Sequence, residues 1–193
     1  MSEESFKNVY QFKITLDDIR PPIWRRIQVP ETYNFKELHL AIQMSMGWKD
    51  CHLHNFKIKN VTISMHDQID DDYGIEDELD ERKTCIKDWF KKPLDCAMYE
   101  YDFGDGWDHI IQLEKIEPAQ PGVQYPRCTG GERACPPEDC GGTFGYEKLL
   151  HILKTPSEEE HDEKKMWLDR RGYGKSFDPE KFSADDIFAN WDD

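Results

Sequence analysis

Residues 99–109, Tyr-Glu-Tyr-Asp-Phe-Gly-Asp-Gly-Trp-Asp-His, constrain the fold more than any other stretch of the chain. Aromatic side chains alternate with polar ones at Tyr99, Tyr101 and Phe103, which is the period of a β-strand. The glycines that follow permit the tight turn needed to return the chain into a second apolar run. The segment therefore predicts a β-hairpin, with strands at about 98–103 and 109–116.

The N-terminal part predicts a second hairpin. Apolar and polar residues alternate over 10–16, a proline-containing turn follows, and an extended run covers 23–29. A further strand is expected over 52–64, and it would place His52 and His54 on one face because alternate residues of a strand share a face. Together these strands predict a mixed, mainly antiparallel sheet.

Helices are expected to cover this sheet. Four apolar residues recur at spacings of three and four over residues 34–46, and Gly47 is typical of the end of such a helix. These are Phe35, Leu38, Ile42 and Met46. His39 lies one position round from that stripe, which predicts a histidine on the helix surface. Residues 83–90 are expected to form a short strand or turn.

The C-terminal part predicts a helical tail, with helices at about 143–153, 158–170 and 183–191. The sequence thus predicts an α+β fold in which a mixed, mainly antiparallel sheet is covered by helices. We expect one domain over residues 1–193, with a core at about 8–154 and a helical C-terminal appendage at about 155–193.

Two segments between these elements have unusual compositions. Residues 66–82 are mostly acidic, and only crudely resemble the ligand spacing of a calcium loop, so we expect a solvated loop. Residues 125–142 are rich in glycine, proline and cysteine, which predicts an irregular loop without regular strands or helices.

The charge balance limits the partners. With 25 basic and 40 acidic residues, the net charge is −15, which repels the phosphate backbone of nucleic acids, so such partners are disfavoured. No apolar run approaches the length of a membrane span, and the N-terminus has no signal-peptide pattern. We therefore expect a cytoplasmic protein with six reduced cysteines.

Four ordered motifs resemble the plasmid pRiA4b ORF-3-like family, over roughly residues 8 to 185. They are Pro21-Pro22-Ile23-Trp24-Arg25-Arg26, Trp48 before His52 and Phe56, Tyr101-Asp102-Phe103-Gly104-Asp105-Gly106-Trp107 with His109, and Cys135-Pro136-Pro137-Glu138-Asp139-Cys140-Gly141-Gly142. The resemblance implies a compact α+β domain and an association with plasmids and transposable elements. It implies no particular reaction.

The same motifs contain a set of candidate metal ligands, namely His52, His54, Asp102, Asp105, His109, Glu138 and Asp139. Imidazole and carboxylate groups together suit divalent Zn, Mn or Fe, and an open coordination position could activate water. The catalytic candidates are Asp102, Asp105, His109 and Glu138. The structural alternative is that the aspartates cap backbone N–H groups of the turn and that the histidine fixes it.

The cysteines leave three interpretations open. Cys128, Cys135 and Cys140 are separated by six and four residues, and only the second spacing fits a zinc site. They could hold a metal together with His52, Cys51 or His54, they could be reduced buried thiols, or they could oxidise to a disulfide after purification.

Two functional hypotheses follow. The first is a binding or regulatory module that contacts an unknown protein or small molecule through the 102–109 turn and the 125–142 loop. Its candidate binding residues are Trp107, Tyr125, Trp24 and Arg25, with Trp107 and Tyr125 expected to be exposed. The alternative is a metal-dependent hydrolase or lyase, which requires at least three of His52, His54, Asp102, Asp105 and His109 to converge.

Overall fold

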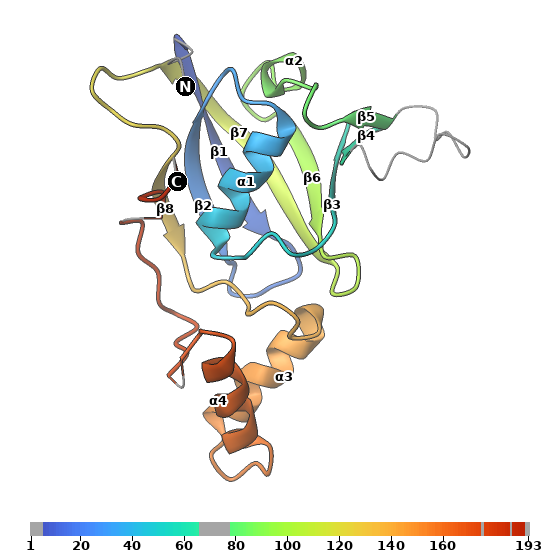
Figure 1. The fold of residues 1–193 in the computed structure, drawn as a ribbon, viewed down its shortest axis with the longest axis vertical. Coiled ribbons are helices and arrows are strands. Elements are labelled where there is room, and N and C mark those ends of the chain that lie inside the picture. Colours follow the sequence, from blue (N-terminus) through green and yellow to red (C-terminus); the bar gives the residue numbers. More distant parts are fainter. Residues whose placement is uncertain (1–5, 66–77, 175, 186, 192–193) are drawn as a thin grey trace.

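The computed structural model describes residues 6–65, 78–174, 176–185 and 187–191, and it contains one eight-stranded sheet with the order β5-β4-β3-β6-β7-β1-β2-β8 (Figure 1). The strands are β1 Asn8–Leu16, β2 Trp24–Pro30, β3 His54–Ile58, β4 Val61–Ser64, β5 Glu78–Asp80, β6 Cys96–Tyr101, β7 Trp107–Pro118 and β8 Arg127–Glu132. All strand pairs are antiparallel except β4 with β5, which confirms the predicted mixed, mainly antiparallel sheet.

The predicted central hairpin forms. β6 and β7 pair in the register Tyr99 with His109 and Tyr101 with Trp107. The turn begins at Asp102, two residues earlier than expected, and Asp102 and Gly106 both adopt positive φ angles, of 56° and 68°. β7 also pairs with β1, which places the hairpin in the middle of the sheet.

One face of the sheet is covered by α1, Phe35–Met46 (Figure 1). A capping box joins Asn34 and Glu37 at its start, and Gly47 ends it with φ of 83°. Aromatic rings fill the space beneath the helix, as in the edge-to-face contact of Phe35 and Phe56 at 5.0 Å. The opposite face of the sheet carries polar side chains. This is expected because an antiparallel sheet with one face exposed to water has polar residues on that face.

The C-terminal helices lie beyond the end of the sheet rather than on its face (Figure 1). α3, Gly142–Lys154, packs against α4, His161–Arg170. The described residues of 172–191, which we call the strap, then run back along the core. The backbone N–H of Ala134 donates to Pro179, and the ring of Trp191 stacks on Tyr33 with centroids 5.9 Å apart.

Four expectations about local structure are wrong. The single strand over 52–64 is interrupted by a turn at Lys59 and Asn60, which both have positive φ. Residues 83–90 contain a short helix, α2, Ile86–Trp89. The 125–142 loop contains β8. The described residues of 183–191 form turns, because the strap's aromatic side chains dock on separate parts of the core rather than along one helical stripe.

The glycines of β8 explain why this strand is hidden in the sequence. A Cβ at Gly131 would lie 2.6 Å from the ring of Phe182 and 2.8 Å from the carbonyl oxygen of Trp24. Glycine is therefore needed for close approach at a position where composition alone indicates a loop. Within the described part of the chain, each helix is too short or too polar to cross a membrane.

Candidate functional site

The structure brings His52, Asp102 and Asp139 together near the end of the central hairpin. One ligand atom from each lies within 4.8 Å of the others. The Nε2 atom of His52 is 3.6 Å from Oδ2 of Asp102 and 3.2 Å from Oδ1 of Asp139. Nε2 is fully buried and makes no hydrogen bond in the described structure. Ligands of one tetrahedral ion at about 2.1 Å are about 3.4 Å apart, which is close to the two distances from His52.

The local backbone explains how Asp102 is aimed. Its Oδ1 atom accepts the N–H groups of Gly104 and Asp105 at 3.0 and 3.3 Å, which leaves Oδ2 facing His52. The N–H of Asp102 donates to the carbonyl of Leu53 at 2.9 Å. Asp102 therefore caps the turn and offers its second oxygen to the site, so the structural and metal interpretations of this residue are compatible.

A close contact between turn and loop positions Asp139. Asp105 accepts the N–H of Gly141 at 3.0 Å, and a Cβ on Gly142 would lie 2.4 Å from the carbonyl oxygen of Asp105. Asp105 therefore holds the loop in place and is not one of the three residues that group together. Asp139 has φ of 57°, a conformation that aspartate tolerates better than most residues.

Glu138, the neighbouring catalytic candidate, is buried and anchors the 125–142 loop to the core. Its carboxylate accepts the Tyr101 hydroxyl at 2.8 Å and the N–H of Lys49 at 3.0 Å, and Cys51 donates its thiol at 3.5 Å. Burial and the adjacent Glu138 carboxylate raise the pKa of Tyr101 well above its usual range. Tyr101 therefore stays a neutral donor, and Glu138 acts as a structural acceptor.

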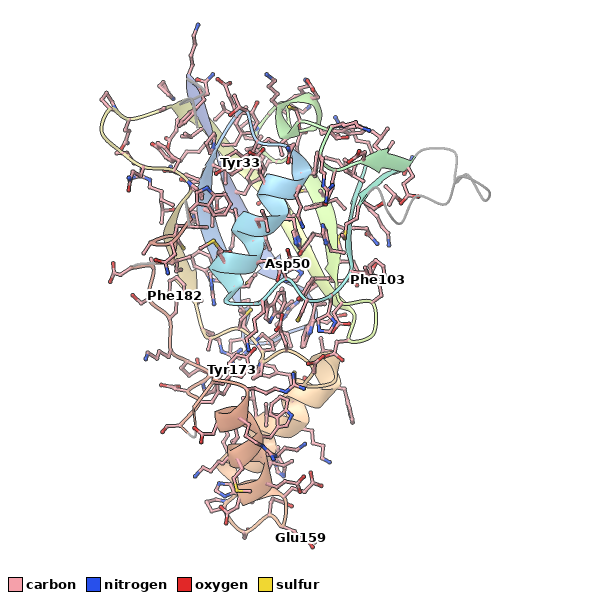
Figure 2. All side chains as sticks on the ribbon, viewed as in Figure 1. Tyr33, Asp50, Phe103, Glu159, Tyr173 and Phe182 are labelled. Carbon is pink, nitrogen blue, oxygen red and sulfur yellow. The ribbon has the colours of Figure 1, made fainter. Side chains whose placement is uncertain are left out.

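A pocket of about 480 Å³ adjoins the group, and both His52 and Asp102 line it. The same pocket is also lined by Asp50 and Lys36, whose charged atoms are 3.4 Å apart. Asp50 and Phe103, which also lines the pocket, lie toward the same end of the sheet (Figure 2). Burial alone would raise the pKa of Asp50, but the hydrogen bond from His39 and the charge of Lys36 lower it to about 2. Asp50 is therefore ionised at neutral pH.

A second histidine group lies beside Asp50. His39 and His54 are fully buried, and their rings stack with centroids 3.4 Å apart and planes 5° from parallel. His39 contacts Asp50 through Nε2 at 2.7 Å and the Tyr99 hydroxyl through Nδ1 at 2.8 Å. Burial lowers the pKa of His39 to about 4. The expectation that His39 is a surface residue is therefore wrong.

The stacked pair has the geometry of hydrogen-bonded dyads. His54 contacts Glu81 at 2.7 Å, and Glu81 is fully buried although it belongs to the acidic segment expected to be solvated. The lone pairs of an imidazole lie in its ring plane, so two parallel stacked rings cannot direct them at one ion. Although His39, Asp50 and His54 bring three ligand atoms within 4.8 Å, this arrangement does not suit a metal. Residues 66–77 of the acidic segment lie outside the described residues.

His109 stands apart from both groups. It is fully buried beneath the sheet's covered face, and its Nδ1 lies 3.3 Å from the carbonyl oxygen of Tyr99. Burial lowers its pKa to about 4, so it is neutral at physiological pH. Of the five residues that the enzyme hypothesis required to converge, His52 and Asp102 do so, and Asp139 completes the group in place of His54, Asp105 and His109.

The cysteines do not gather with other ligands. No group of three or more candidate ligand atoms in the described residues contains Cys128, Cys135 or Cys140, and all are free thiols. Cys135 lies 3.3 Å from the sulfur of Met46 in the core. Burial raises the pKa of Cys135 and of Cys140 to about 12, so both are protonated. The structure thus favours the interpretation as reduced thiols.

The candidate binding residues differ in exposure. Trp107 is 1% exposed, so the expectation that it lies on the surface is wrong; its indole packs near Trp48 in the core. Tyr125 and Trp24 are half-buried. Arg25 is 3% exposed and lines a different pocket.

Four residues near the two groups were missed by sequence reasoning, namely His39, Asp50, Glu81 and Arg171. The guanidinium of Arg171, at the end of α4, pairs with Oδ2 of Asp139. A basic residue in the last turn of a helix is expected to interact with the helix dipole, so its sequence position alone does not indicate a contact with the site. The alternation of Cys51-His52-Leu53-His54 was the one local signal, since it placed two histidines near an apolar face.

Comparisons with known proteins agree with the resemblance. A sequence model of the plasmid pRiA4b ORF-3-like protein family matches residues 8–186. The uncharacterized protein y4hQ of Sinorhizobium fredii is 33% identical over 187 residues, which are 95% of this chain and 94% of that protein. The crystal structure of a protein of unknown function, MM3350 from Methanosarcina mazei Go1, is 42% identical with a TM-score of 0.82, and the match covers 94% of this chain and 98% of that one.

Proposed function

The chain belongs to the plasmid pRiA4b ORF-3-like protein family, and we propose that it is a binding module for a divalent transition-metal cation. His52, Asp102 and Asp139 would hold the cation. The observation that carries this proposal is that three segments distant in sequence place three ligand atoms within 4.8 Å of one another. Each residue comes from a different motif of the family resemblance.

The donor set and its electrostatics support a metal. One imidazole nitrogen and two carboxylate oxygens suit Zn, Mn or Fe in the divalent state. A buried nitrogen without a hydrogen bond is costly unless something satisfies it, and the distances of 3.2 and 3.6 Å suit shared ligation better than direct hydrogen bonds. The 102–109 turn and the 125–142 loop each supply one ligand, so they act together as the binding surface.

The adjoining pocket gives the module a place for a small-molecule partner. His52 and Asp102 line this pocket as well as the ligand group, so a cation held there would face its interior. Three protein ligands leave at least one coordination position for water or a partner's donor atom.

A metal-dependent hydrolase or lyase is the second candidate, and the open pocket favours it because catalysis needs room for a substrate beside the cation. Asp50 also lines this pocket, but His39 and Lys36 hold its carboxylate, and its pKa of about 2 makes it a weak general base. Cation binding is therefore the function that the geometry supports best.

The test is isothermal titration of the chelator-treated full chain with Zn²⁺, Mn²⁺ and Fe²⁺. We expect about one equivalent of at least one cation to bind, and affinity to fall at least tenfold in His52→Ala and Asp102→Asn. The second variant keeps an oxygen for the N–H of Gly104 and so separates ligation from turn capping.

His151→Ala is the matched control, because His151 is an exposed histidine on α3 and should leave binding unchanged. Absence of binding, or equal binding by the wild type and both site variants, would refute the proposal. For the hydrolase alternative, metal-loaded protein would be screened for cleavage of ester and phosphoester substrates with the same variants.

A further inference from the structure

A second pocket, of about 400 Å³, lies between the C-terminal end of α1, the start of β2 and the strap. Tyr173 and Phe182, which mark two positions along the strap in Figure 2, both line it. Its walls are largely apolar, and they include Met44, Met46, Phe177, Phe182 and Ile187. This is the size and lining of a small-molecule site, and it is separate from the residues proposed to bind the cation.

The unusual feature of this pocket is the buried guanidinium of Arg25. Arg25 is 3% exposed, and it forms three hydrogen bonds, all to backbone carbonyl oxygens. Nε donates to Ser45 at 2.8 Å, and Nη1 donates to the carbonyls of Trp24 and Glu132 at 2.8 and 3.0 Å. In the described structure, Nη2 has no hydrogen-bond partner and no carboxylate lies within 4.0 Å of the side chain.

The neighbouring arginine shows the contrast. Arg26 points to the opposite face of the sheet, where Glu114 receives it through two hydrogen bonds of 2.6 and 2.9 Å. The more exposed arginine thus has a carboxylate partner, and the more buried one has none among the described residues. A buried cation is costly unless it is paired, so the arrangement at Arg25 is electrostatically incomplete.

Capping of α1 accounts for only part of the arginine. The bond to Ser45 satisfies a carbonyl near the helix end, and the ring of Phe182 lies 4.5 Å from the guanidinium carbon. Neither contact uses the donors of Nη2. Nη2 itself is not fully buried, so it retains access to solvent on the side where Arg25 lines the pocket.

We propose that this pocket binds a small organic monoanion, a carboxylate on an apolar body, with the carboxylate on Nη2 of Arg25. The charged lining residues are Arg25, Lys181 and Asp178, which leave a local charge of +1 in a chain whose net charge is −15. One carboxylate neutralises that charge, and the flexible methionine and aromatic walls accommodate an apolar chain or ring.

The experiment is calorimetric titration of the full chain with octanoate, hexanoate and octanamide in the presence of EDTA. The chelator keeps the cation site empty, so this result is independent of the proposed function. We expect octanoate to bind at least tenfold more tightly than neutral octanamide. Octanoate should also bind about fifteenfold more tightly than hexanoate, because each of its two additional methylenes contributes roughly a factor of four.

Two variants, Arg25→Gln and Ala134→Phe, locate the site, and Arg20→Gln is the control. Arg25→Gln should abolish the preference for octanoate over octanamide, whereas Arg20→Gln, at an exposed arginine outside the pocket, should leave it intact. Ala134→Phe would fill the pocket while keeping Arg25 in the sequence, and it should remove binding of both ligands. This second variant decides the matter if Arg25→Gln does not fold.

Three results would overturn the proposal: no binding of octanoate to the folded wild type, equal affinity for octanoate and octanamide, or octanoate binding that survives Ala134→Phe. A preference for octanoate that disappears in Arg25→Gln and persists in Arg20→Gln supports it.

Discussion

The two histidine groups use the same kinds of side chain and differ in geometry. In the His39–His54 group, each imidazole nitrogen that faces a carboxylate is 2.7 Å from its oxygen, and the rings are parallel. In the His52 group, one nitrogen faces two carboxylates at 3.2 and 3.6 Å without a hydrogen bond. The first group is held by these short contacts, although Nδ1 of His54 and Oε1 of Glu81 are buried without a hydrogen-bond partner, whereas the two distances at His52 are close to the spacing of ligands around an ion. Distance and ring orientation therefore separate a structural group from a candidate site.

The largest expected effect on stability comes from breaking the buried contact between His54 and Glu81. His54→Ala leaves the carboxylate of Glu81 buried without its partner, which should lower the free energy of unfolding by about 3–5 kcal/mol. His52→Ala, at a half-buried position, should cost less than about 1 kcal/mol. Urea unfolding of both variants measures the difference, and equal losses would erase the distinction between the groups.

The next effect concerns the packing that brings the ligands of the second group together. Gly142→Ala would place a Cβ 2.4 Å from the carbonyl oxygen of Asp105 at a φ of 67°. We expect a loss of about 2–4 kcal/mol from backbone strain and overpacking, together with weaker cation binding. Gly122→Ala is the control, since Gly122 has φ of 76° but open space around it; it should cost about 1 kcal/mol. Thermal unfolding and metal titration check both, and similar losses would mean that the contact with Asp105 is not tight.

Acid should destabilise the fold through the buried histidines His39 and His109. The pKa values of His39 and His109 are lowered from 6.5 to about 4, so the unfolded state binds more protons between these pH values. Stability is therefore fully present above about pH 6.5 and falls as the pH drops toward 4. At pH 5 each histidine should cost about 2 kcal/mol relative to pH 7.

Urea unfolding at pH 7 and pH 5 measures this loss. His109→Leu removes one of the two groups and should reduce the loss by about half. A loss that is insensitive to His109→Leu would show that this histidine does not titrate differently on unfolding.

The smallest expected effect concerns Arg171, which would compete with a cation for the carboxylate of Asp139. Arg171→Ala releases Oδ2 of Asp139, so cation affinity should rise a few-fold, while stability changes by less than about 1 kcal/mol because the pair is partly exposed. Arg170→Ala, at the neighbouring exposed arginine, should leave affinity unchanged. Lower affinity in Arg171→Ala would mean that the arginine positions Asp139 rather than competes for it.

The sequence predicted what depends on local periodicity. Alternation revealed the central hairpin, and spacings of three and four revealed α1, because each pattern repeats within one element. The ligand group was predicted only in part: His52, Asp102 and Asp139 were all selected by their chemistry, but the choice among seven candidates depended on strand register and on a loop contact. The closeness of Gly142 to Asp105 is such a contact, and no local pattern contains it.

The buried polar groups were hidden for a related reason. Glu81 lies in a run of acidic residues that indicates solvent, and only its pairing with His54, 27 positions away in sequence, explains its burial. His39 likewise depends on Tyr99, 60 positions away. Burial of a charged or polar side chain is set by its tertiary partner, so it cannot be derived from neighbouring residues.

The most direct test of the central claim is anomalous X-ray diffraction from crystals of the full chain grown with Zn²⁺. We predict one strong anomalous peak about 2.0–2.2 Å from Nε2 of His52 and from carboxylate oxygens of Asp102 and Asp139. A peak between His39 and His54, at the cysteines, or at none of these positions would contradict the account.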